Sequence, residues 1–278
     1  MSPERGRGAD REPGRDRPAD ERVVEVGSAR LAVRILAGDK TREPFVVLHG
    51  GVDAITTLRH FPHQLATLTG RTVIAYDRSG HGRSSPVTDP RPDDHRQLEA
   101  DGVALLLDQL AIDRAVLVGH SDGGTIALLT AGRHKHRVSG VLALTPQVVN
   151  NPTVDSGIAR VVATYPTSGL RAALHRHHGD AVDQVFGGWA DVWQRDVFTA
   201  ASVEDDLAAI DCAISVVSGH EDPYGWRDNA MLLAATVTAP FTLRALSGVG
   251  HTPHLEASAV SAGAAAELIA DRPPTDSA

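Results

Sequence analysis

The sequence of 278 residues contains one cysteine, Cys212, and only 4% of it is aromatic. A single cysteine excludes an internal disulfide and a zinc site built from several thiolates. No stretch comes near the roughly 20 consecutive apolar residues that a membrane span needs. The N-terminus also lacks the apolar segment of a secretory signal. We therefore expect a cytoplasmic protein with no membrane partner.

The chain also lacks an excess of positive charge. It has 27 Lys and Arg against 35 Asp and Glu, a formal net charge of −8. Proteins that bind nucleic acid rely on clustered positive charge, so we expect no nucleic-acid partner. With 42% hydrophobic and 22% charged residues, the chain suits one large globular domain. The composition leaves the oligomeric state open, a homodimer included.

Both ends of the chain have compositions that oppose folding. Residues 2–20 hold no large apolar side chain, and residues 271–278 read DRPPTDSA. Such segments cannot bury enough surface to offset the entropy that is lost on ordering. We predict a disordered leader over residues 1–21 and a loose tail over 271–278.

Between the ends, short β-branched runs alternate with longer segments of helical period. The interior runs are almost continuous Val, Ile, Leu and Ala, as in strands covered on both faces. The alternation predicts an α/β fold, a mostly parallel, eight-stranded twisted sheet flanked by helices, whose first two strands form an antiparallel hairpin. The expected strands are 23–26, 31–36, 45–48, 73–76, 115–118, 141–144, 214–217 and 241–246, and the expected helices are 60–68, 97–110, 124–132, 227–235 and 256–270.

The alternation stops once, between residues 147 and 205, where no strand-like run occurs. This segment contains Trp189 and Trp193, two of the three tryptophans. A long helical insertion between two strands is typical of a cap over a binding site, although it also suits an extra layer over the core. We predict a helical cap over 147–205 and a core formed by 22–146 and 206–270.

The sharpest motif is Gly119-His-Ser-Asp-Gly123, which follows a strand-like run and precedes a helix-like run. A serine in Gly-x-Ser-x-Gly between a strand and a helix is typical of a nucleophile elbow. The glycines leave space where a Cβ would collide with the neighbouring strand and helix. The N-terminus of the helix directs its partial positive charge at the reacting oxygen. We predict that Ser121 is a nucleophile.

A serine hydroxyl needs a base to take its proton, and two histidines follow the last strand-like run. His251 heads the loop at the carboxyl edge of the sheet, where open α/β sheets place their sites. His254 is its rival, at the start of the final helix. The loop after 214–217 supplies an acid to orient the imidazole, and we prefer Asp222 to Glu221.

Two backbone amides are candidates for an oxyanion hole. His49-Gly-Gly51 follows the strand-like run 45–48, and Asp122 comes directly after the proposed nucleophile. The amides of Gly51 and Asp122 would both donate hydrogen bonds to a developing oxyanion.

The many histidines also raise the question of a metal site. His175, His177 and His178 lie close together in the cap sequence, but no carboxylate or cysteine stands beside them at ligand spacing. We therefore expect no metal and no cofactor.

Together these residues resemble the α/β-hydrolase superfamily, over roughly residues 22–270. The order of serine, acid and histidine along the chain is that of the superfamily. The run Tyr-Asp-Arg-Ser-Gly-His-Gly-Arg-Ser at 76–84 also resembles its signature after the strand that precedes helix B. The resemblance implies a triad of Ser121, Asp222 and His251 beneath a helical cap.

Other residues take structural or binding roles in this interpretation. We read Asp77, Arg78 and His81 as structural residues that tie down a turn. The residues expected to contact a small-molecule substrate are Val52, His120, His178, Trp189 and Trp193.

Departures from related families narrow the function. Haloalkane dehalogenases and epoxide hydrolases of the superfamily carry Asp at the elbow, where this chain has Ser121. Proline iminopeptidases continue His-Gly-Gly with Pro-Gly, where this chain has Val52-Asp53. Large lipases have broad apolar lids, whereas this cap is rich in His, Arg and Asp.

The resemblance therefore implies a serine hydrolase acting on a small carboxylic ester or related acyl compound. The same triad also serves carbon–carbon bond hydrolases, perhydrolases and cofactor-free lyases. Some members of the superfamily are receptors without catalysis.

Overall fold

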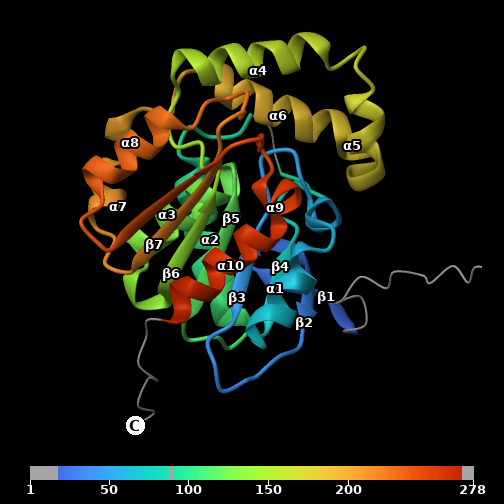
Figure 1. Cartoon of the computed structure of the whole chain (residues 1–278). Coiled ribbons are helices and arrows are strands. Elements are labelled where there is room, and N and C mark those ends of the chain that lie inside the picture. The colour runs from blue at the N-terminus through green and yellow to red at the C-terminus, as the bar shows by residue number, and fades with distance from the viewer. Residues whose placement is uncertain (1–17, 88–89, 271–278) are drawn as a thin grey trace, which may run out of the picture.

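In the computed structural model, which describes residues 18–87 and 90–270, eight strands form one sheet in the order β1-β2-β4-β3-β5-β6-β7-β8 (Figure 1). β2 pairs antiparallel with β1 and with β4, and all other neighbours are parallel. The predicted fold class and the edge hairpin are confirmed. The strands are β1 Ala19–Val26, β2 Ala29–Leu36, β3 Phe45–Leu48, β4 Val73–Tyr76, β5 Ala115–His120, β6 Val138–Leu144, β7 Ala213–Gly219 and β8 Phe241–Leu246.

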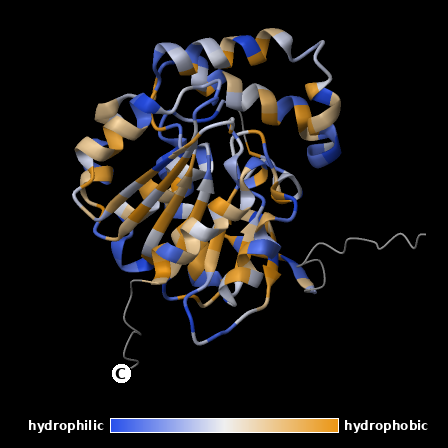
Figure 2. Ribbon diagram, viewed as in Figure 1, coloured by the Kyte–Doolittle hydropathy of each residue, from blue (hydrophilic) through white to orange (hydrophobic). Residues whose placement is uncertain are grey.

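The central strands are buried on both faces because they are apolar throughout. In β3, Phe45 and Val47 pack in one apolar cluster, and Val46 and Leu48 pack in another. Successive side chains of a strand point to opposite faces, so a strand without polar residues needs cover on both. Figure 2 shows this concentration of hydrophobic residues in the sheet.

Helices supply the cover. α1 and α10 pack together over one face of the sheet, and α2, α3 and α8 contribute to the cluster on the other (Figure 1). Of the helices in the described residues, none combines the length and the apolar character that a membrane crossing requires. The core helices are α1 Phe61–Thr69, α2 His95–Gln109, α3 Asp122–Arg133, α7 Glu204–Ala208, α8 Arg227–Thr236, α9 Pro253–Glu256 and α10 Ser258–Ala270.

A separate helical layer is inserted between β6 and β7, above the sheet (Figure 1). It consists of α4 Pro152–Thr164, α5 Leu170–His178 and α6 Val182–Gln194. These helices share an apolar cluster of their own, which includes Trp189 and Trp193. The three helices lie within residues 147–205, and the division into a cap over 147–205 and a core over 22–146 and 206–270 stays a prediction.

The first strand begins earlier than the apolar pattern indicates. β1 starts at Ala19, inside the predicted leader of residues 1–21. Its polar start pairs with the end of β2, and the Glu21 carboxylate accepts hydrogen bonds from Arg34 and Arg83. Main-chain pairing and ion pairs, not apolar packing, hold this part of the strand. Its sequence therefore shows no apolar pattern from which the strand could be predicted. The rest of the leader, residues 1–17, and the tail, 271–278, lie outside the described residues.

Candidate active site

Ser121 occupies a strained turn between β5 and α3. Its φ of 52° and ψ of −120° are angles that residues with side chains seldom adopt. A Cβ at Gly119 would overlap the carbonyl of Gly123, and a Cβ at Gly123 would overlap the carbonyl of His49. The two glycines therefore let strand, turn and helix pack closely around Ser121.

His251 and Asp222 are hydrogen-bonded partners from two different loops. Asp222 follows β7, His251 follows β8, and His251 Nδ1–H donates to Asp222 Oδ2 over 2.9 Å. Glu221, the alternative acid, accepts instead from the Val249 amide at 2.9 Å and so ties the two loops together. His254, the alternative base, is buried at the start of α9. The geometry thus favours Asp222 and His251 over their neighbours.

Ser121 and His251 line the same cavity, of about 130 Å³, beneath the cap. Within the described residues, the hydrogen bonds of His251 go to Asp222, His120 and Thr145, and none goes to Ser121. Bonds between a nucleophile and its base often tighten only when substrate binds. The lining consists of Gly51, Val52, Asp53, His120, Ser121, Gln147, Val154, Ile158, Trp189, Trp193, Tyr224, His251 and Thr252.

Buried side chains hold the loop that carries Gly51 through its carbonyl groups. Arg78 Nη2 donates to the Gly50 carbonyl at 2.9 Å, and His81 Nε2 lies 2.9 Å from the Gly51 carbonyl. A trans peptide directs its N–H opposite to its C=O. The bond from Arg78 to Gly50 therefore turns the Gly51 N–H away from Arg78. Asp122 begins α3, where amide N–H groups have no acceptor within the helix. These orientations suit an oxyanion hole.

A neutral histidine also fixes this loop. Burial, together with the Arg78 guanidinium, lowers the pKa of His49 to about 3. Neutral His49 accepts from the Arg78 amide at Nε2 over 3.0 Å and donates from Nδ1 to the Gly50 carbonyl over 2.9 Å. Arg78, predicted above to be structural, thus connects its own turn to the loop that carries Gly51 through both its backbone and its side chain.

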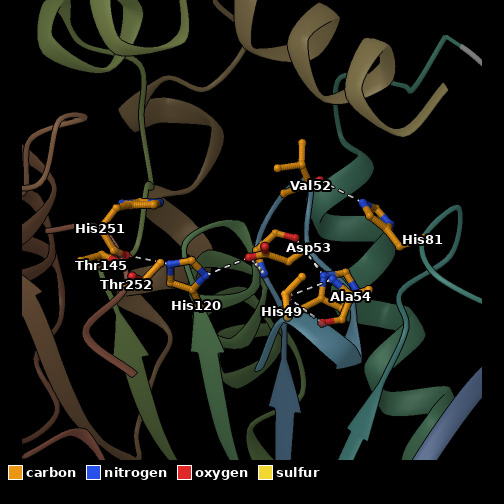
Figure 3. Close-up of polar contacts among 12 residues, drawn as sticks. His49, Val52, Asp53, Ala54, His81, His120, Thr145, His251 and Thr252 are labelled. Atoms are coloured by element: carbon orange, nitrogen blue, oxygen red, sulfur yellow. Dashed lines mark hydrogen bonds and ion pairs between the residues drawn. The ribbon is translucent and has the colours of Figure 1, made fainter. Parts of the chain in front are cut away.

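His120, next before Ser121, joins two loops of the site (Figure 3). Its Nδ1–H donates to Asp53 Oδ2 at 3.2 Å, and its Nε2 lies 2.8 Å from the His251 carbonyl. The Thr145 hydroxyl donates to the same carbonyl at 2.8 Å. Burial acts to raise the pKa of Asp53, but the hydrogen bond and the charge of His120 outweigh burial and lower it. Asp53 is therefore an ionised carboxylate in the cavity wall.

Asp122 is held by an arginine that the sequence analysis did not single out. Arg96 Nη2 donates to Asp122 Oδ1 over 2.5 Å, and both side chains are almost fully buried. Burial opposes ionisation of Asp122, but the Arg96 charge prevails and lowers the pKa of the carboxyl. The guanidinium carbon of Arg96 lies 3.5 Å from the ring centroid of Phe198 and 4.6 Å from that of Trp193. Arg96 thus connects the cap to the residue after the proposed nucleophile.

The structure brings most of the predicted substrate contacts together. Val52, His120, Trp189 and Trp193 line the cavity. His178 lies outside the lining, because its Nε2 donates to the Val52 carbonyl at 2.9 Å and its Nδ1 accepts from the Gly82 amide at 3.0 Å. It fastens the cap to two core loops instead. The lining residues that the sequence analysis did not predict are Asp53, Gln147, Val154, Ile158, Tyr224 and Thr252.

The described part of the chain contains no group of three or more His, Cys, Asp or Glu side chains arranged to hold a metal ion. His177, considered above as part of a metal cluster, contacts Thr56 Oγ1 of the core at 2.7 Å.

Comparisons with known proteins agree with this architecture. The sequence matches the alpha/beta hydrolase fold family over residues 43–200. It is 32% identical over 170 residues to a protein of Mycobacterium phage D29 named as a non-heme haloperoxidase, a match covering 60% of this chain and 55% of that protein. It is 34% identical over 97 residues to a bifunctional esterase/perhydrolase of Acinetobacter calcoaceticus, a match covering 34% of each. The chain thus spans about half or less of the length of these relatives.

A solved structure shows the same fold. The 2-hydroxy-6-oxo-6-phenylhexa-2,4-dienoate hydrolase of Rhodococcus sp. strain RHA1 superposes with a TM-score of 0.73 at 18% identity, covering 90% of this chain and 98% of that one. With the sheet order, the cap and the family match in agreement, the chain belongs to the alpha/beta hydrolase fold family.

Proposed function

We propose that this protein is a serine hydrolase that cleaves a small carboxylic ester through an acyl-enzyme. One observation carries the proposal. The hydrogen-bonded pair of Asp222 and His251 stands beside a cavity that Ser121, in its strained turn, also lines. Nucleophile, base and orienting acid are the three parts that such chemistry needs.

The reaction begins with proton transfer from Ser121 to His251 Nε2. Ser121 Oγ then attacks the ester carbonyl carbon, and the amides of Gly51 and Asp122 bind the negative oxygen. His251 returns the proton to the departing alcohol, which leaves Ser121 acylated. A water molecule, deprotonated by His251, attacks the acyl carbon and releases the acid. Throughout, Asp222 holds the Nδ1–H tautomer and stabilises the imidazolium.

The size of the cavity supports a small acyl compound as the substrate. Its volume of about 130 Å³ is below the roughly 300–1,000 Å³ of sites for drug-sized ligands. Cap residues Val154, Ile158 and Trp193 provide apolar walls. We expect short acyl chains to be preferred, because longer ones would have to displace the cap.

Labelling and ester hydrolysis together test the proposal. A fluorophosphonate probe should modify the wild-type protein once per chain and leave Ser121→Ala unmodified. The wild type should hydrolyse p-nitrophenyl acetate with a kcat/KM at least tenfold above that for p-nitrophenyl octanoate. Labelling of Ser121 without turnover of any ester in the series would contradict the proposed reaction.

A second acyl acceptor is suggested by the relative named as an esterase/perhydrolase. In perhydrolysis, hydrogen peroxide replaces water in attacking the acyl-enzyme, and the product is a peracid. Ser121 and His251 would act as nucleophile and base in this reaction too. Hydrogen peroxide is the only added reactant. The ester assay repeated with peroxide, with peracid measured by bromide oxidation, separates the two acceptors.

The identity of the acid gives a sharp prediction. Asp222→Asn should lower kcat for p-nitrophenyl acetate by about 10⁴-fold, because an amide no longer enforces the Nδ1–H tautomer of His251. Glu221→Gln, the matched neighbour, should lower it only several-fold, since Glu221 bonds the Val249 amide and not the imidazole. Steady-state kinetics give kcat for both variants. A larger loss of kcat in Glu221→Gln than in Asp222→Asn would make Glu221 the acid.

A further inference from the structure

A second cavity lies between α2 and the hairpin of β1 and β2. Its volume is about 450 Å³, against about 130 Å³ for the candidate active site, and the two share no lining residue. That volume falls within the usual range of small-molecule sites. We call it the α2 cavity; its lining includes Val26, Leu31, Tyr76, His95, Leu98 and Leu105.

Most of the α2 cavity is apolar, and part of its apolar rim is open to solvent. Leu98 and Leu105 on α2 are 53% and 47% exposed, although both face this cavity. Opposite them stand Val26 and Leu31 of the hairpin, which are buried. Removing apolar surface from water is favourable, and the gain grows with the area removed. An apolar chain lying between α2 and the hairpin would therefore be stabilised along its length.

The lining contains two buried side chains with polar atoms, Tyr76 and His95, and one of these atoms, His95 Nδ1, has no hydrogen-bond partner among the described residues. Tyr76 is 4% exposed and His95 is 6% exposed. Most buried polar groups in proteins are paired, because leaving one unpaired is unfavourable. A polar group of a bound molecule would relieve that cost.

The charged residues of the lining have both signs, Arg91 positive and Glu99 and Asp101 negative, so they do not favour a head group of one charge. The two carboxylates are already paired, Glu99 with Arg78 and Asp101 with Arg133. Burial and the Arg96 charge lower the pKa of His95 to about 3, so the imidazole is neutral near pH 7. Hydroxyl and neutral imidazole both accept and donate hydrogen bonds, as an alcohol does.

The N-terminal leader is a poor occupant on sequence grounds. β1 enters the sheet at Ala19, paired with Leu36, at the end of the hairpin opposite to Val26 and Ala29. Residues 2–18 contain no large apolar side chain to fill an apolar cavity.

We propose that the α2 cavity binds a small amphipathic molecule, with an apolar chain between α2 and the hairpin and a neutral hydroxyl at Tyr76 and His95. The proposal does not rest on the proposed ester hydrolysis, because the two cavities are lined by different residues.

A cavity-filling substitution tests the site with a matched control. A Cβ at Gly102, which lines the cavity from α2, would meet no atom within 4 Å, and the same holds for Gly263 on α10, outside the cavity. Titration calorimetry with 1-octanol should show one site per chain in the wild type and in Gly263→Leu. Gly102→Leu should bind at least tenfold more weakly, while all three proteins hydrolyse p-nitrophenyl acetate at the same rate.

The polar contacts are tested separately. Tyr76→Phe should weaken 1-octanol binding about fivefold, the scale of one neutral hydrogen bond. Octanoate and octylammonium should each bind at least tenfold more weakly than 1-octanol. Octanol binding unaffected by Gly102→Leu would overturn the site, and tighter binding of either ion would overturn the neutral head group. A wild-type dimer in sedimentation that Gly102→Leu dissociates would make a second copy of the chain the occupant and also overturn the proposal.

Discussion

Ser121→Ala is expected to lower kcat/KM for p-nitrophenyl acetate by about 10⁶-fold, the scale of triad serines. The reason is that the variant loses the covalent route altogether. Any remaining hydrolysis would have to use water, helped only by His251 and the amides of Gly51 and Asp122. Alanine keeps the Cβ of serine, so the strained turn at φ 52° is retained and the fold should survive. Stopped assays with the ester in excess measure the loss.

Ser139→Ala is the matched control for this substitution. Ser139 lies on β6, beside the strand that leads to Ser121, and its buried hydroxyl has no partner among the described residues. Its removal should leave both the melting temperature and kcat/KM within about twofold of the wild type. If Ser121→Ala kept a tenth or more of the activity while remaining free of the fluorophosphonate label, the nucleophile would be another group.

Local signals in the sequence were sufficient to predict the elbow. Strand, Gly-x-Ser-x-Gly and helix stand next to one another in the chain, and each glycine is required by a contact between adjacent elements, as the overlaps at Gly119 and Gly123 show. The eight-stranded sheet was predictable for a similar reason. Strands such as β3 are apolar at every position, and only cover on both faces explains that pattern.

Contacts between distant segments were not predictable in this way. Asp53 and His120 are 67 residues apart, and Arg96 and Asp122 meet only because α2 packs beside α3. No periodicity encodes such a meeting, because it depends on how whole helices and loops dock. The cap also has one feature that local sequence predicts and one that depends on docking. Its place between β6 and β7 followed from a missing strand, whereas the exclusion of His178 from the cavity depends on the docked position of α5.

The unpredicted histidine burial has a large consequence for stability in acid. We expect His49 and His95 alone to lower the free energy of unfolding by about 4 kcal/mol between pH 7 and pH 5. Burial lowers the pKa of His49 and His95 from 6.5 to about 3, and lowers those of His81 and His254 well below 6.5. His49 and His95 therefore stay neutral in the folded chain at pH 5, and burial disfavours the protonated forms of His81 and His254, whereas all four bind a proton once the chain unfolds. Protons therefore favour the unfolded state as the pH falls below 6.5.

The magnitude follows from linkage. Each such histidine makes stability fall by about 1.4 kcal/mol per pH unit once the unfolded side chain is fully protonated. The stabilisation that each neutral histidine gives is complete above pH 6.5. It is lost progressively as the pH falls towards the pKa of that histidine in the folded chain, which is about 3 for His49. Asp53 and Asp122, whose pKa values are lowered in the folded chain, add to the loss only below about pH 4. Total stabilities of roughly 5–15 kcal/mol are usual for domains, so a loss on this scale is a large fraction of the stability.

Urea unfolding at pH 7, 6 and 5 measures the effect, and one variant isolates a single histidine. His254 is 2% exposed and its Nδ1 has no partner among the described residues. His254→Leu removes one titrating group without breaking a hydrogen bond at that atom, and should reduce the fall in stability between pH 7 and pH 5, because burial lowers the pKa of His254 in the folded chain. The control His136→Leu, at an exposed position, should leave the fall unchanged. Equal stability of the wild type at pH 7 and pH 5 would mean that these imidazoles are protonated in the folded chain. The assignment of a neutral His49, bonded to the loop that carries Gly51, would then be wrong.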